Sequence, residues 1–365
     1  MTGKSVRKTV CGMTILATLA GFTAAATAGD KVMLKSRYKP GEKIYYQSKS
    51  NIIQTIKAPM GEMEFSMNQL RGDVMTVVSS SKTESKLTSA MDRMSFEMSM
   101  PMMGDLKYDS DIPSMEEAPP IRDLFKPMLG EALTFTLDGN NKVSSVGGVQ
   151  ELIRKVEEGS QGNPFIQGFK QAFTEEEVKQ EIDQLNTRML PNREIEVGGT
   201  RTAQIEESLG QLGKTATFDC TFKLDRIGDR GGVRSAFISF TGKPKSLNDK
   251  IEIPGGGLPA GLKIKGGKLK GEIAFDIERG VVVKRSRQVE CDVGMPEPEK
   301  NAEGDAPAPM NFSAKTLSTH SSVMMSMKDR EEERKKNAKL AAELKAREEK
   351  EFDGEDTDDD DDSEE

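Results

Sequence analysis

Tryptophan is missing from this chain of 365 residues, and the sequence holds only four tyrosines and one histidine. No local pattern places a nucleophile or an orienting acid beside the single histidine, His320, which we expect to lie exposed on the last strand. Phosphate-binding loops, Cys-x-x-Cys pairs and His-Glu-x-x-His zinc motifs are also absent from the sequence. We therefore expect a protein that is not an enzyme and that carries no cofactor.

Cysteine is scarce too, with three in the chain, of which Cys220 and Cys291 follow the N-terminal leader described below. Each of these two occupies one of the alternating apolar positions of a predicted strand. If the strands between residues 215 and 293 form a simple meander, the two cysteines lie three strands apart, or about 14 Å. A disulfide needs Cα atoms within about 7 Å. Although an oxidising compartment would preserve a disulfide, the spacing favours two buried free thiols.

Positive charge is not concentrated anywhere in the chain. The formal net charge is -8, and residues 353–365 alone hold ten acidic side chains and no basic one. The rest of the chain is close to neutral, so no nucleic-acid partner is expected. We predict that residues 352–365 form a disordered acidic tail, which either only solubilises the chain or also binds cations or a basic protein partner weakly.

The first 28 residues have the character of a cleavable export signal. Lys4, Arg7 and Lys8 precede an apolar stretch of small residues, which ends in Ala26-Thr27-Ala28. A cationic start, a short apolar run and a small-x-small site are what the export machinery and signal peptidase recognise. The apolar stretch is too short to cross a membrane comfortably. We expect a periplasmic or extracellular protein that does not span a membrane after cleavage.

Strict alternation of apolar and polar residues dominates both ends of the remaining chain. The clearest run is Met94-Ser-Phe96-Glu-Met98-Ser-Met100, and others occupy residues 133–137, 218–224 and 273–277. Such alternation is typical of antiparallel strands with one buried and one wet face. We predict that Met94, Phe96, Met98 and Met100 lie on the covered face.

The middle of the chain changes to a helical period. Apolar stripes begin at Val149, Phe165 and Val178, and Thr174 with Glu177 forms a capping box. The pattern predicts a mainly β (α+β) fold, in which a curved antiparallel sheet or half-open barrel is covered by a helical segment at about 118–190. This single domain is expected to span residues 29–327. A solvated, charged helix should follow at 328–351, with too few leucines for a specified coiled coil.

Several short patterns resemble a family of uncharacterised secreted bacterial proteins, a domain of unknown function. They are Tyr38-x-Pro40-Gly41-Glu42-Lys43-x-Tyr45, Tyr108-Asp109-Ser110, Leu129-Gly130 through Asp138-Gly139, and Leu190-Pro191 followed by Val197-Gly198-Gly199-Thr200. The resemblance covers about residues 32–327, and it departs from the family pattern at Arg201, where tryptophan is usual. The order of elements is also similar to the half-open barrel with a helical lid of periplasmic lipoprotein carriers, by analogy of fold alone. The family has no established activity.

Methionine is the one residue in excess, with 21 in the chain. We name as candidate ligand-binding residues those that alternate on two predicted strands: Met63, Phe65, Met67, Met94, Phe96, Met98 and Met100. Flexible thioether side chains suit either a core or the wall of an adaptable apolar pocket. The favoured hypothesis is an exported protein that binds an apolar or lipid-like ligand between sheet and helices. The alternatives are an envelope interaction protein with a filled core, and a methionine-based copper binder.

Overall fold

The computed structural model describes residues 30–59, 61–101, 104–112, 118–160, 162–163, 165–209, 214–249, 261–295 and 312–352. The export signal predicted at 1–28 and the acidic tail beyond residue 352 lie outside these ranges. Within the described part, no helix has both the length and the apolar character that crossing a membrane requires.

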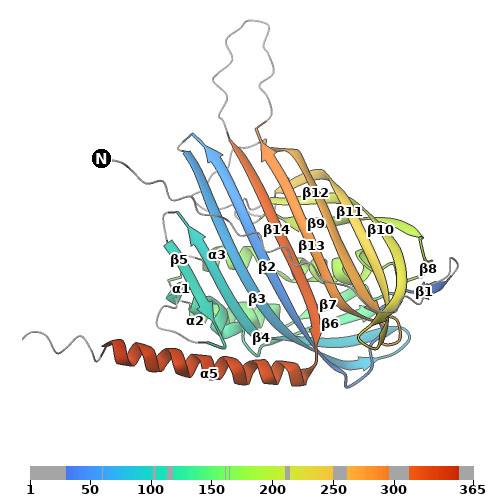
Figure 1. Cartoon of the computed structure of the whole chain (residues 1–365), viewed down its shortest axis with the longest axis horizontal. Helices are drawn as coiled ribbons and strands as arrows, with labels where there is room; N and C mark the ends of the chain where they lie inside the picture. Colours follow the sequence, from blue (N-terminus) through green and yellow to red (C-terminus); the bar gives the residue numbers. More distant parts are fainter. Residues whose placement is uncertain are drawn as a thin grey trace, which may run out of the picture.

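An antiparallel sheet of twelve strands dominates the fold (Figure 1). Its first strands are β2 (Lys43–Ala58), β3 (Gly61–Ser80), β4 (Glu84–Met100), β5 (Gly104–Asp109), β6 (Ala132–Asp138) and β7 (Val143–Gly147). Its later strands are β9 (Thr200–Ser208), β10 (Lys214–Arg230), β11 (Val233–Asp249), β12 (Lys263–Asp276), β13 (Val281–Gly294) and β14 (Ser313–Met325). The strand order is β7-β6-β4-β3-β2-β14-β13-β12-β11-β10-β9, with β5 also paired to β4. The predicted class, mainly β with an open antiparallel sheet and a helical segment, is confirmed.

Short helices from the middle of the chain cover one face of this sheet. They are α1 (Pro119–Phe125), η1 (Lys126–Met128), α2 (Val149–Gly159), α3 (Ile166–Ala172), α4 (Glu175–Asp183) and the π-helical turn η2 (Gln184–Arg188). The predicted cap of α4 is present, because the Thr174 side chain accepts a hydrogen bond from the Glu177 backbone N–H at 3.2 Å. A small second sheet pairs β1 (Lys31–Met33) with β8 (Glu194–Glu196).

The burial of residues 92–100 confirms the predicted alternation of covered and exposed side chains along β4. Met94, Phe96 and Met98 are buried on the inner face, the face that the helices cover, whereas Glu97 is exposed on the outer face. A β-bulge interrupts this alternation at Asp92, because Gly72 pairs with Arg93 while the next residue of β3 pairs with Met91. The extra residue places Met91 and Met94 on the same face and turns Arg93 outward.

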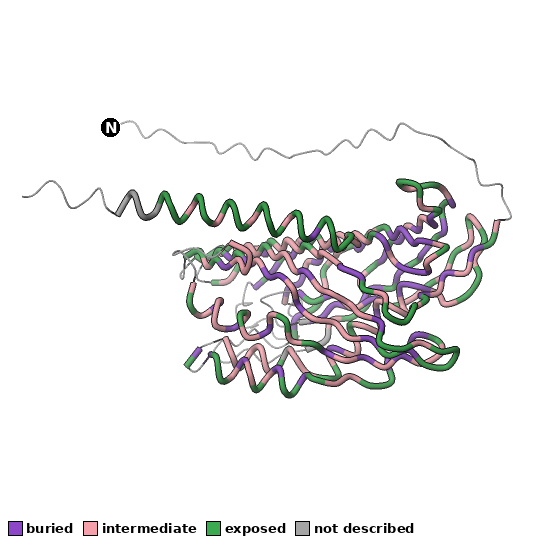
Figure 2. Tube along the Cα trace, turned by 90° about the horizontal axis from the view of Figure 1, so that it is seen from below, coloured by how far each residue is buried: buried purple, intermediate pink, exposed green. Residues whose placement is uncertain are grey.

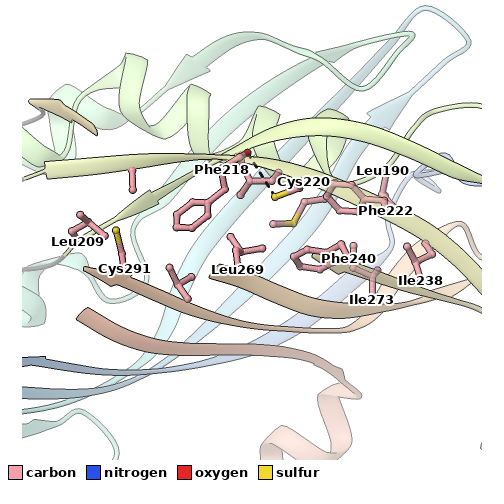
Figure 3. Packing of buried hydrophobic residues seen from close by; sticks show 14 of the residues in the cluster. Leu190, Leu209, Phe218, Cys220, Phe222, Ile238, Phe240, Leu269, Ile273 and Cys291 are labelled. Atoms are coloured by element: carbon pink, nitrogen blue, oxygen red, sulfur yellow. Dashed lines mark hydrogen bonds between the residues drawn. The ribbon is translucent and has the colours of Figure 1, made fainter. Parts of the chain in front are cut away.

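The two largest of four apolar clusters lie towards the two ends of the inner face. The first cluster comes mainly from β9–β13, and Figure 3 shows its centre; it includes Ile205, Phe218, Cys220, Phe222, Ile238, Phe240, Leu269, Ile273, Val289 and Cys291. The second cluster joins β4–β6 to the helices; it includes Met91, Met94, Phe96, Met98, Tyr108, Ile121, Leu124, Phe135, Leu152 and Val178. Phe125 of α1 stacks near Phe96 and Tyr108, with ring centroids 5.6 and 6.2 Å apart.

The two cysteines are confirmed as buried free thiols. They lie on β10 and β13, and the strand order β10-β11-β12-β13 puts two strands between them, as the meander predicts. Figure 3 shows them on separate strands within the first cluster.

The charged helix forms as α5 (Met327–Phe352) and extends past the edge of the sheet beside β5 (Figure 1). Figure 2 shows it along one side of the body, with most of its residues exposed. The expectation of a fully solvated helix is wrong for its first turns, because Arg330 is only 2% exposed.

Candidate functional site

The seven candidate residues share the inner face but divide between the two clusters. Met94, Phe96 and Met98 are buried members of the second cluster, and Met67 and Met100 pack against it. Met63 and Phe65 pack instead against the first cluster, further along β3. The structure therefore places these side chains at both borders of the space between the clusters. A ligand site at these residues stays a prediction.

A polar band separates the two apolar clusters on the inner face. It consists of two neighbouring rows of register partners from β13, β14, β2 and β3: Arg287, His320, Ser50 and Gln69 in one row, and Arg285, Ser322, Ser48 and Arg71 in the other. The rows continue into the second cluster at Phe96 and Met94. In the other direction they lead through Gly271 and Ile273 to the first cluster.

The side chains of the polar band lie deep in the molecule and yet keep contact with solvent. Burial, together with the charges of Arg287 and Arg285, lowers the pKa of His320 to about 3. All eight residues of the band are nevertheless only half-buried, and the Arg71 side chain is 39% exposed. The polar band is therefore a partly solvated region between the two apolar clusters. The expectation that His320 is exposed is wrong, because the register turns it inward.

Ion pairs neutralise only some of the arginine side chains of the polar band. The Arg71 guanidinium contacts the Asp73 carboxylate at 2.8 Å, and Arg287 contacts the buried Glu207 at 2.9 Å. Burial, and to a smaller extent the charge of Arg287, lower the pKa of Arg285 to about 10, against the opposing effect of nearby carboxylates. Among the described residues, no carboxylate lies within ion-pair distance of Arg285; its nearest recorded polar contact is the Met189 sulfur at 3.9 Å.

An open cavity of about 900 Å³ runs across seven strands. Its lining includes Ser95 and Glu97 of the outer face, and also one row of inner-face positions: Phe240 of the first cluster, Gly271, and Arg287, His320, Ser50 and Gln69 of the polar band. Register partners form two rows along it: Ser239, Glu272, Ser286, Ser321, Lys49, Leu70 and Ser95, and then Thr241, Lys270, Gln288, Thr319, Asn51, Asn68 and Glu97. Nearly all these side chains are polar, as a solvent-facing sheet surface requires.

A buried ionic network, which we call the α5 socket, holds the first turns of α5 on the outer face. Arg330 donates hydrogen bonds to Asp92 at 2.6 Å and to both oxygens of Asp111 at 2.7 and 3.0 Å. Arg93 binds Asp109 and Glu333 at 3.2 and 2.6 Å. Gln47 and Asn337 complete the network through Glu333 and Asp111.

Tyr45 forms the floor of the α5 socket. It is fully buried, and the Arg330 guanidinium lies 5.6 Å from its ring centre. The ring occupies the space over Gly72, where a Cβ atom would lie 2.0 Å from the tyrosine oxygen. The tyrosine and the Tyr108-Asp109-Ser110 stretch, which both carry the family resemblance, thus meet near this helix. Sequence reasoning missed the socket, because its only local signal is an arginine at one i,i+3 contact with a glutamate.

No described group of three or more histidine, cysteine or carboxylate side chains has the arrangement of a metal site. The copper alternative rests on methionine instead. It was suggested by the alternating methionines at 98, 100 and 102, of which Met98 is buried in the second cluster and residue 102 lies outside the described ranges. This alternative stays untested.

Residues 82–282 match the model of a family described as "Family of unknown function (DUF6263)". The match spans more than half of the chain. The chain belongs to this family. The resemblance to a domain of unknown function is thereby confirmed, and no curated protein matches the chain.

Solved structures show only distant likeness. A structure titled for lipid–protein interactions in lipovitellin aligns with 80% of this chain and 26% of its own, at 10% identity and a TM-score of 0.40. An outer membrane channel from Pseudomonas putida F1 aligns with 82% of this chain and 100% of its own, at 8% identity and a TM-score of 0.22. DynF from the dynemicin biosynthesis pathway of Micromonospora chersina aligns with 87% and 92%, at 8% identity and a TM-score of 0.17. This chain spans about a quarter of the lipovitellin chain, and none of these scores supports an inference about function.

Proposed function

We propose that this protein is an exported, non-enzymatic carrier that binds a lipid-like ligand on the inner face of its sheet, beneath the helices. The observation that supports this most is the wetted polar band between two apolar clusters. A folded core that serves stability alone closes such a gap, because packed interiors leave few voids larger than a water molecule.

The borders of this space suit an apolar chain. Phe65 and Met67 are half-buried on the inner face of β3, at the junction of the two clusters. Methionine side chains adapt to ligands of different shape at little cost, since they are unbranched and polarisable. A ligand here buries its apolar chain against these side chains and contributes roughly 25 cal/mol per Å² of apolar surface removed from water.

The absence of tryptophan makes a direct test possible, because one introduced tryptophan is the only indole in the protein. Phe65→Trp places this reporter on the inner face of β3, and Leu70→Trp places it on the outer face of the same strand. Both native side chains are half-buried, so the two variants are matched. A brominated fatty acid quenches an indole only at close contact.

We expect the brominated fatty acid to quench the tryptophan of Phe65→Trp saturably and to leave that of Leu70→Trp unchanged. Near-native circular dichroism of both variants is the control for folding. No saturable quenching in Phe65→Trp, or equal quenching in both variants, contradicts the carrier proposal. In that case the filled-core interaction protein becomes the better hypothesis.

A further inference from the structure

The polar band contains charge that the protein's own carboxylates leave partly unmatched. Arg71 and Arg287 each have a carboxylate partner, at Asp73 and Glu207. Arg285 has none within ion-pair distance among the described residues, although it lies beneath the helices near Met189. Arg285 is half-buried, and partial loss of the water around a guanidinium without a counter-ion costs free energy, so this cation is a candidate binding group.

The surroundings of Arg285 are those of an anion site. Its row on the sheet reads Arg285, Ser322, Ser48, Arg71 across four adjacent strands, so two hydroxyl groups lie between two guanidinium groups. Three strand spacings set the outer Cα atoms about 14 Å apart. The Arg71 guanidinium is held by Asp73, whereas Arg285 contacts only the Met189 sulfur among the described residues. Hydroxyl groups beside such a cation donate hydrogen bonds to an anionic oxygen.

Charges near Arg285 do not cancel its own. Glu181 and Glu207 act on it from a distance and raise its pKa, but burial and the positive charge of Arg287 outweigh them, so that its pKa lies at about 10. The neighbouring His320 keeps a pKa of about 3, because burial and the same two arginines disfavour a further positive charge. Burial is the main cause of both pKa shifts, and the charges of the neighbouring arginines add to it.

We propose that Arg285, with Ser322 and Ser48 beside it, binds the acidic head group of an amphiphile whose apolar chain lies along the neighbouring cluster. The ligand class is a carboxylate or phosphate carried on a hydrocarbon chain. This inference rests on the proposed carrier function and adds the head-group site to it. Arg285 pairs with Ile273 of the first cluster, against which Phe65 also packs, so head group and chain occupy adjoining parts of one face.

The test compares a brominated fatty acid with its methyl ester, using Phe65→Trp as the reporter background. We expect the acid to bind about tenfold more tightly than the ester, since a charge-assisted hydrogen bond is worth about 1.5 kcal/mol or more. Arg285→Gln should remove this difference by weakening acid binding and leaving ester binding unchanged. Lys284→Gln, a neighbouring exposed cation on the outer face, is the matched control and should behave as the background does.

Each outcome separates the head-group site from the carrier function. Equal binding of acid and ester in the background variant, or a loss of both on Arg285→Gln, overturns the head-group site and leaves the carrier proposal standing. Binding of neither molecule overturns both proposals. A lysophospholipid with a terminal phosphate and inorganic phosphate serve as competitors. If inorganic phosphate displaces the acid at the same concentration as the lysophospholipid does, the site binds free anions. That result overturns the proposal that the ligand is an amphiphile.

Discussion

Replacement of Arg330 by alanine tests whether the α5 socket holds the C-terminal helix. The arginine is 2% exposed and contacts Asp92, Asp111 and Glu333. Removing one partner of a buried ionic network costs about 3–5 kcal/mol, because the remaining charges stay buried without compensation. Most of the rest of α5 is exposed, so the loss should appear as undocking of the helix rather than as global unfolding. A loss of 3 kcal/mol raises the undocked population about 100-fold.

Native-state hydrogen exchange measures this population directly. Amides of residues 327–337 should exchange about 100-fold faster in Arg330→Ala than in the wild type, while those of β13 should keep their protection. The matched control is Arg334→Ala, since Arg334 is 59% exposed and only approaches Asp92 at 3.8 Å. An exposed pair is worth about 1 kcal/mol or less, so exchange should change only about fivefold. Equal acceleration in the two variants would refute the reasoning, because it would show that burial of Arg330 adds nothing.

Gly72→Ala should lower the melting temperature by several degrees, because its Cβ would lie 2.0 Å from the Tyr45 oxygen; Tyr45→Phe should change it little, since that hydroxyl has no hydrogen-bond partner among the described residues. A thermal scan that ranks the two variants the other way contradicts the packing of the socket. Protein lacking residues 1–28 should react with two equivalents of a thiol reagent when denatured and far more slowly when native, since burial raises the pKa of Cys220 and of Cys291 to about 12; zero equivalents would indicate a disulfide. The imidazole of His320 should stay neutral from pH 8 down to about pH 4, because its folded pKa of about 3 lies below the unfolded value. Its contribution to stability is therefore complete above about pH 6.5 and declines as the pH falls towards 3. Titration near pH 6.5 in the NMR spectrum of the native protein would show that His320 is not enclosed.

The sequence alone determined which residues share a face of each strand. Side chains alternate with a period of two, so Met94, Phe96 and Met98 had to lie on one side, whichever strands paired with β4. It also determined the start of α4, because the Thr174 cap is satisfied by a backbone N–H three residues away. The meander that separates Cys220 from Cys291 was also predictable, because strands joined by short turns usually pair with each other.

Only the tertiary structure decided which faces meet across the sheet. The polar band exists because β14 returns to pair with β2, which brings Arg285 and Ser322 beside Ser48 and Arg71. Alternation along a strand predicts the face on which each residue lies, but not which residues of other strands lie beside it. No local sequence pattern therefore predicted this row. Arg330 likewise meets Asp92 across 238 residues of chain, and the carboxylate reaches it from a bulge that breaks the alternation. The charged helix had looked fully solvated, because its anchor is a set of partners that become neighbours only after the strands have paired.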